Sequence, residues 1–157
     1  TSIDTWRVAV SYPPGWEAIS LPDLGLVNIR EPEGVGDLVI WEMSYAAAEE
    51  LGLPIGPGSA GQGYLQRMID PKASATGYEW EFGETEVVPT LAGEAFIAEA
   101  HSAPLAARTY LAVLPMQERV LTFEVRLQLD RNWGYYQPIY EQIIKSVVPI
   151  TGHEVAF

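Results

Sequence analysis

The chain contains no cysteine. Without thiols it forms no disulfide, no thiolate metal site and no thiol nucleophile, although this absence does not indicate a compartment. Histidine is scarce too, with two residues in the whole chain. No apolar run approaches the roughly 20 residues of a membrane-spanning helix, so the sequence predicts no membrane span.

Positive charge is also in short supply, with nine lysines and arginines against 21 aspartates and glutamates. The net charge of −12 repels phosphate backbones, so we expect no nucleic-acid partner. We interpret the acidity as a means of solubility rather than as a docking surface. The chain starts without methionine, which favours a mature form whose leader or membrane anchor was removed, although an artificially shortened chain would look the same. Any membrane association would then depend on that removed N-terminal anchor.

What is present fits a single domain over residues 1–157, because the chain shows no internal repeat and no linker. In its first half, residues 5–12 alternate between two faces, one carrying Trp6, Val8, Val10 and Tyr12 and the other Arg7, Ala9 and Ser11, and a second strand is expected at 16–19 after a proline-glycine turn. This arrangement predicts a hairpin. Further strands are predicted at 26–30 and 37–45. One face of the latter carries Val39, Trp41, Met43 and Tyr45.

A helix is predicted after the proline- and glycine-rich loop at 52–58. Ser59 is its expected cap, Gln62 the capping-box partner and Pro71 the residue that stops it. Its expected buried stripe consists of Tyr64, Leu65, Met68 and Ile69.

The second half predicts an antiparallel meander. A strand over 78–82, with Tyr78, Trp80 and Phe82 on one face, bends at Gly83 and continues through 87–88. Three more strands follow at 94–101, 108–114 and 118–128. In the last strand, one face carries Leu121, Phe123, Val125 and Leu127, and the other carries Thr122, Glu124, Arg126 and Gln128.

The chain ends in an amphipathic helix predicted at 135–147, preceded by a turn at 132–134. The start is placed there because proline is tolerated in the first turn of a helix, and the segment contains Pro138. Pro149 is expected to end it.

Three segments resemble the PsbP-like family, which includes the Mog-type Ran-binding proteins and many bacterial lipoproteins. They are WRVAVSYPPGWEAI (6–19), similar to the family's first hairpin, ERVLTFEVRLQ (118–128), similar to its last long strand, and YYQPIYEQIIKSVVPI (135–150), similar to its terminal helix. The resemblance implies an α/β/α sandwich around an antiparallel sheet. It also implies a binding or assembly role, often outside the cytoplasm.

Candidate chemistry is sparse. Glu99 and His101 share a strand face with Glu94 nearby, which could begin a metal site, but a solvated polar face is the favoured interpretation. The glycine-rich stretch at 56–63 lacks a phosphate-binding lysine, and no Gly-x-Ser-x-Gly motif for a serine nucleophile occurs. The paired carboxylates, such as Glu79 with Glu81 or Glu84 with Glu86, are expected to point to water. The sequence predicts no cofactor and no catalytic residue.

Aromatic residues are the candidate binding residues, expected in a pocket between the sheet and the terminal helix. They are Trp41, Trp80, Trp133, Tyr135 and Tyr136. Core packing is the favoured interpretation for Trp41, Trp80, Tyr136 and Tyr140, whereas Trp133 and Tyr135 are expected to be partly exposed.

The sequence thus predicts an α+β fold, a central twisted antiparallel sheet flanked by helices. We expect a non-catalytic, extracytoplasmic binding or assembly domain with an unidentified protein partner. The alternative is a START-like carrier or enzyme that holds a small apolar ligand in a cavity under the C-terminal helix.

Overall fold

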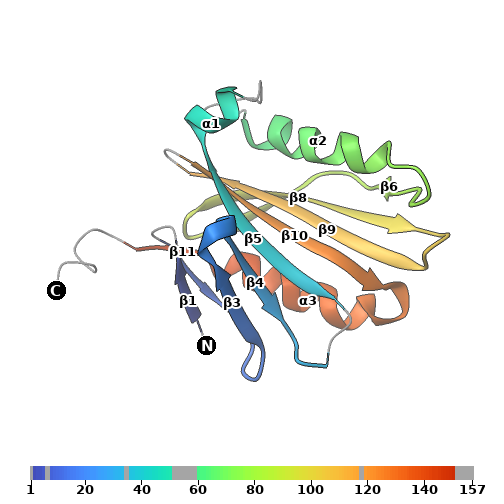
Figure 1. The fold of residues 1–157 in the computed structure, drawn as a ribbon, viewed down its shortest axis with the longest axis horizontal. Coiled ribbons are helices and arrows are strands. Elements are labelled where there is room, and N and C mark those ends of the chain that lie inside the picture. The colour runs from blue at the N-terminus through green and yellow to red at the C-terminus, as the bar shows by residue number, and fades with distance from the viewer. Residues whose placement is uncertain (1, 6–7, 34–35, 51–59, 117–118, 151–157) are drawn as a thin grey trace.

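An eight-stranded antiparallel sheet forms the body of the protein, with α2 on one face and α3 on the other (Figure 1). The computed structural model describes residues 2–5, 8–33, 36–50, 60–116 and 119–150. The strand order is β3-β4-β5-β10-β9-β8-β6, and β7 also pairs with β8. The strands are β3 (Glu17–Leu21), β4 (Leu26–Arg30), β5 (Asp37–Ser44), β6 (Glu81–Phe82), β7 (Glu86–Thr90), β8 (Gly93–Ser102), β9 (Ala107–Pro115) and β10 (Arg119–Leu129). This architecture confirms the predicted α+β sandwich.

A second, three-stranded sheet joins the two ends of the chain. It contains β1 (Ser2–Thr5), β2 (Val8–Ser11) and β11 (Val148–Pro149), with β2 in the middle. The predicted hairpin of 5–12 with 16–19 is therefore wrong, because β2 pairs with β1 and β11 while β3 pairs with β4. Two consecutive prolines, Pro13 and Pro14, cannot donate to a ladder, so the turn carries the chain from one sheet to the other.

One face of the large sheet is covered by α2 (Ala60–Ala73). Its buried side chains, including Tyr64 and Leu65, contact the sheet residues Ala98, Leu111, Val113 and Val120. The helix continues two residues beyond Pro71, because the backbone N–H of Ser74 can still donate to the carbonyl of Asp70, at 3.1 Å. Pro71 thus does not stop the helix as predicted. The expected cap, Ser59, lies outside the described residues, and the short α1 (Tyr45–Glu50) and 3-10 helix η1 (Pro22–Leu24) were not predicted.

The other face carries the larger core under α3 (Asp130–Lys145). This helix begins directly after β10, five residues before the predicted start, so Pro138 lies in its interior. The four buried residues Trp133, Tyr140, Ile143 and Ile144 hold α3 against the sheet despite the hydrogen bond that proline removes. No described helix is long and apolar enough to cross a membrane.

A β-bulge in β10 changes the face of the sheet to which the following side chains point. Val125 pairs with Tyr110 on β9, but the next pair is Gln128 with Arg108, so β10 holds one extra residue. Beyond the bulge Gln128 is buried and meets Tyr140 of α3, while Leu127 packs with Trp80 on the α2 face. The predicted alternation therefore holds through Val125 and is wrong for the last two positions.

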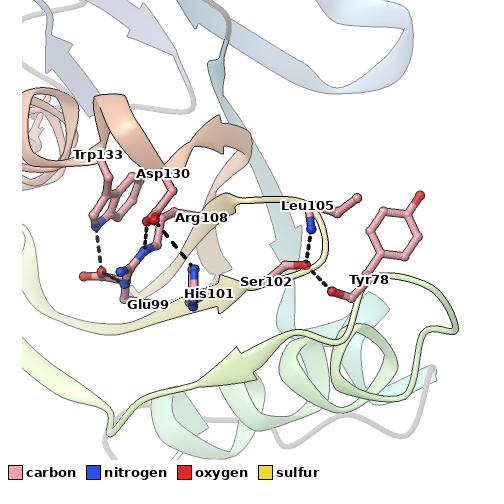
Figure 2. Close-up of polar contacts among 8 residues, drawn as sticks. All are labelled: Tyr78, Glu99, His101, Ser102, Leu105, Arg108, Asp130 and Trp133. Atoms are coloured by element: carbon pink, nitrogen blue, oxygen red, sulfur yellow. Dashed lines mark hydrogen bonds and ion pairs between the residues drawn. The ribbon is translucent and has the colours of Figure 1, made fainter.

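The predicted strand at 78–82 is shorter than expected, since only Glu81 and Phe82 pair with β8. Glu79 has a φ of 48°, which interrupts the extended backbone. The rings of Tyr78 and Trp80 stack at 6.4 Å, yet Trp80 is buried and Tyr78 is 48% exposed. The Ser102 hydroxyl donates to the carbonyl of Tyr78 and thereby fixes this segment beside β8 (Figure 2).

Candidate functional site

The five predicted binding aromatics do not form one pocket. Trp133 and Tyr136 lie between α3 and the sheet, whereas Trp80 packs on the α2 face and Trp41 is half-buried on β5. Tyr135 is 70% exposed, as expected for the start of the helix, but Trp133 is 7% exposed and belongs to the core. Trp133 is buried because α3 already includes it in its first turn.

An aromatic cluster fills the space beneath α3. Trp133 lies 5.9 Å from Tyr110 and 6.4 Å from Tyr140, measured between ring centroids. Tyr136 and Tyr140 are 6.1 Å apart, and Trp16 lies 6.2 Å from Tyr136. These spacings are those of favourable ring contacts. The space in which a START-like cavity was expected is therefore occupied by side chains.

Beside this cluster, a polar network joins β8, β9 and the first turn of α3 (Figure 2). Arg108 donates from Nε to Asp130 Oδ1 at 2.7 Å and from Nη1 to Glu99 Oε1 at 3.1 Å. The same Glu99 oxygen accepts a hydrogen bond from Trp133 Nε1 at 2.6 Å. His101 Nε2 lies 3.8 Å from Asp130 Oδ2. The network thus fixes the start of α3 to the sheet.

The Arg108 guanidinium lowers the pKa of Asp130 by hydrogen bonding and by its charge, although burial acts in the opposite direction. We predict that Arg108→Gln raises the pKa of Asp130 toward its ordinary value of 3.8. A depressed native pKa contributes stability above the unfolded pKa that is lost as the pH falls through the native one. Carboxyl NMR titration of the two proteins measures the shift, and equal Asp130 midpoints would contradict this role of Arg108.

The structure does not assemble the metal site considered from the sequence. Glu94 pairs with Pro89 at one end of β8, whereas His101 pairs with Glu81 near the other end. Glu99, between them, already bonds Arg108 and Trp133. In the described part of the chain no three metal-ligating side chains are grouped suitably.

A groove, which we call the edge groove, opens along the edge of the sheet next to this network. Its volume is about 560 Å³, and its walls are Glu81, Phe82, Gly83, Glu84, Glu86, Glu99, His101 and Arg108. The Gly83 N–H donates to the Glu99 carbonyl at 2.9 Å, so the break between β6 and β7 is held against β8. The sequence shows the glutamates at 81, 84 and 86, but it did not predict that the break between β6 and β7 places them in one groove.

A recess of about 210 Å³ shares three glutamates with this groove. It is lined by Glu84, Glu86, Ile97, Glu99, Tyr110 and Gln137. Burial raises the pKa of Tyr110, and the negative charges of Glu141, Glu86 and Glu99 raise it further. The groove walls hold four glutamates and one arginine, so the surface favours cationic groups.

The protein is thus an α/β/α sandwich with a polar groove at one edge of its sheet. Its architecture is PsbP-like. The solution structure of cyanobacterial PsbP (CyanoP) from Synechocystis sp. PCC 6803 matches with a TM-score of 0.66 and 13% identity, over 95% of this chain and 91% of that one. A crystal structure from Bacteroides thetaiotaomicron VPI-5482 matches with a TM-score of 0.58 and 11% identity, over 94% of this chain and 47% of that one.

No protein-family model matches the chain, and no curated protein matches its sequence. The structural match to CyanoP confirms the predicted PsbP-like fold. The Mog-type relationship stays a prediction. At these identities the likeness establishes the fold alone.

Proposed function

We propose that this chain is a non-catalytic binding or assembly domain that holds a cationic segment of a protein partner in its edge groove. The observation that carries the proposal is that Glu81, Glu84 and Glu86 line the groove without an ion-pair partner among the described residues. Uncompensated charge of one sign in a groove attracts the opposite charge and steers its approach.

The recess supports lysine or arginine as the anchoring residue of that segment. Both side chains carry a charged head on a long stem that can reach into the recess. The carboxylates of Glu84 and Glu86 offer acceptors for that head. Arg108 does not compete for these two carboxylates, because it bonds Glu99 and Asp130.

We also propose that the protein is located outside the cytoplasm. It rests on the resemblance to the PsbP-like family and on the likeness of fold to CyanoP. Fractionation of the source cells with an antibody against the chain tests it, and recovery with cytoplasmic markers alone would contradict it.

Binding is tested with a fluorescent ten-residue peptide of alternating lysine and threonine, followed by anisotropy at low and high salt. We expect saturable binding that salt weakens, and roughly tenfold weaker binding for the triple variant Glu81→Gln, Glu84→Gln, Glu86→Gln. The matched control removes three exposed carboxylates elsewhere, as Asp23→Asn, Glu33→Gln and Glu94→Gln. Equal weakening in both triple variants, or no binding by the unmodified protein, would overturn the groove as the site.

A further inference from the structure

Another concavity lies between α3 and the end of β2, and it shares no residue with the edge groove or its recess. It has a volume of about 450 Å³ and is lined by Ser11, Tyr12, Pro13, Pro138, Ile139, Gln142, Ile143 and Ser146. We call it the helix trough. Its volume falls in the range of small-molecule sites.

One wall of the helix trough runs along α3. It is built from Pro138, Gln142 and Ser146, spaced four residues apart, with Ile139 and Ile143 beside them. Positions 138 and 146 of an α-helix lie about 12 Å apart along its axis, so this wall has about that length. The facing wall is the end of β2 with Tyr12 and Pro13. A wall of this length suits a chain-shaped occupant.

The Ser146 hydroxyl at one end of the trough is already satisfied. Its Oγ accepts a hydrogen bond from the Ser11 N–H at 2.8 Å and donates to the Ile143 carbonyl oxygen at 2.6 Å. This hydroxyl therefore requires no ligand group. Apart from the exposed Gln142 and the two serines, the lining consists of Tyr12, two prolines and two isoleucines, and such a largely apolar surface binds hydrocarbon.

The charge of the trough agrees with a neutral occupant. None of its eight lining residues is acidic or basic, in a chain whose net charge is −12. An anionic head would be repelled by the surrounding charge, and a cationic one would find no carboxylate in the trough. We propose that the helix trough binds the single acyl chain of a neutral lipid, with its uncharged head in solvent.

The test uses the neutral fluorophore N-phenyl-1-naphthylamine and its displacement by 1-monolauroylglycerol below micellar concentrations. We expect saturable probe binding, displacement by the neutral lipid, and weaker displacement by laurate at low salt. Gln142→Trp fills the trough from an exposed position, and we expect it to weaken probe binding roughly tenfold or more. Gln66→Trp makes the same change at an exposed position of α2 and should bind as the unmodified protein does.

NMR spectra of the unmodified protein provide a readout that does not depend on how the variants fold. Shifts produced by 1-monolauroylglycerol should centre on residues 11–13 and 138–146. Absence of saturable binding, equal affinities of the two tryptophan variants, or shifts centred on the edge groove would overturn the proposal. A dimer in sedimentation that Gln142→Trp dissociates would also overturn it, because the trough would then be an interface between copies.

Discussion

Replacing Tyr140 with alanine is expected to lower the free energy of unfolding by about 3–5 kcal/mol. Tyr140 is 1% exposed and contacts the rings of Trp16, Trp133 and Tyr136. Its removal leaves a cavity at the centre of the cluster that holds α3 to the sheet. Denaturant unfolding followed by circular dichroism measures the loss, and Tyr135→Ala, at a 70% exposed position, should change stability by less than about 0.5 kcal/mol.

The variant Tyr140→Phe separates the ring from the hydroxyl. Tyr140 donates to Gln128 Oε1 at 3.2 Å, and Gln128 is completely buried. Its Nε2 atom has no hydrogen-bond partner among the described residues. The phenylalanine variant leaves the buried Oε1 unsatisfied, at a cost of about 1–3 kcal/mol. A smaller loss for Tyr140→Ala than for Tyr140→Phe would refute the central role given to the ring.

Gly36→Ala is the second change with a large expected effect, a loss of about 1–3 kcal/mol. A Cβ at this position would lie 2.7 Å from the Leu127 carbonyl oxygen and would overlap the Gln128 side chain. Both partners belong to the segment of β10 that the bulge displaces. Because one contact is backbone, a side-chain rotation cannot relieve it.

The control for this prediction is another glycine. An added Cβ at Gly134, within α3, would meet nothing within 4 Å. Gly134→Ala should therefore stabilise the protein by about 0.5–1 kcal/mol, opposite in sign to Gly36→Ala. Thermal unfolding of the two variants side by side measures both effects. Stabilisation by Gly36→Ala would contradict the prediction, because it would show that the backbone of β10 can move at the bulge to accommodate the added Cβ.

Local sequence patterns were sufficient to predict most strands. The predicted strands at 94–101 and 108–114 differ from β8 and β9 by one residue at each end, although β9 is buried over most of its length and does not alternate between a buried and an exposed face. The partner of each strand was harder to predict. β2 pairs with β11, which lies about 140 residues further along the chain, and the alternation of residues 8–11 does not indicate this partner.

The candidate site was predicted less well than the fold. The sequence offered five aromatic residues as candidates for one pocket and favoured core packing for Trp41, Trp80 and Tyr136. In the structure the candidates divide between two faces, and Trp80, Trp133 and Tyr136 pack in or against the core. The edge groove depends on how β6 and β7 meet β8, which is a tertiary property. Glu81 and Glu86 were correctly expected to point to water, but their proximity to Glu99 arises from pairing rather than from spacing in the chain.

The small sheet also has a consequence for biosynthesis. Val148 pairs with Ala9 and Pro149 with Val8, so β2 is completed by a strand that is synthesised much later. Before β11 has been made, only β1 can pair with β2, and an isolated two-stranded hairpin is marginal in water. Val8 and Val10, which are fully buried in the folded protein, then lack one of the elements that cover them, and such exposed apolar residues favour aggregation during synthesis.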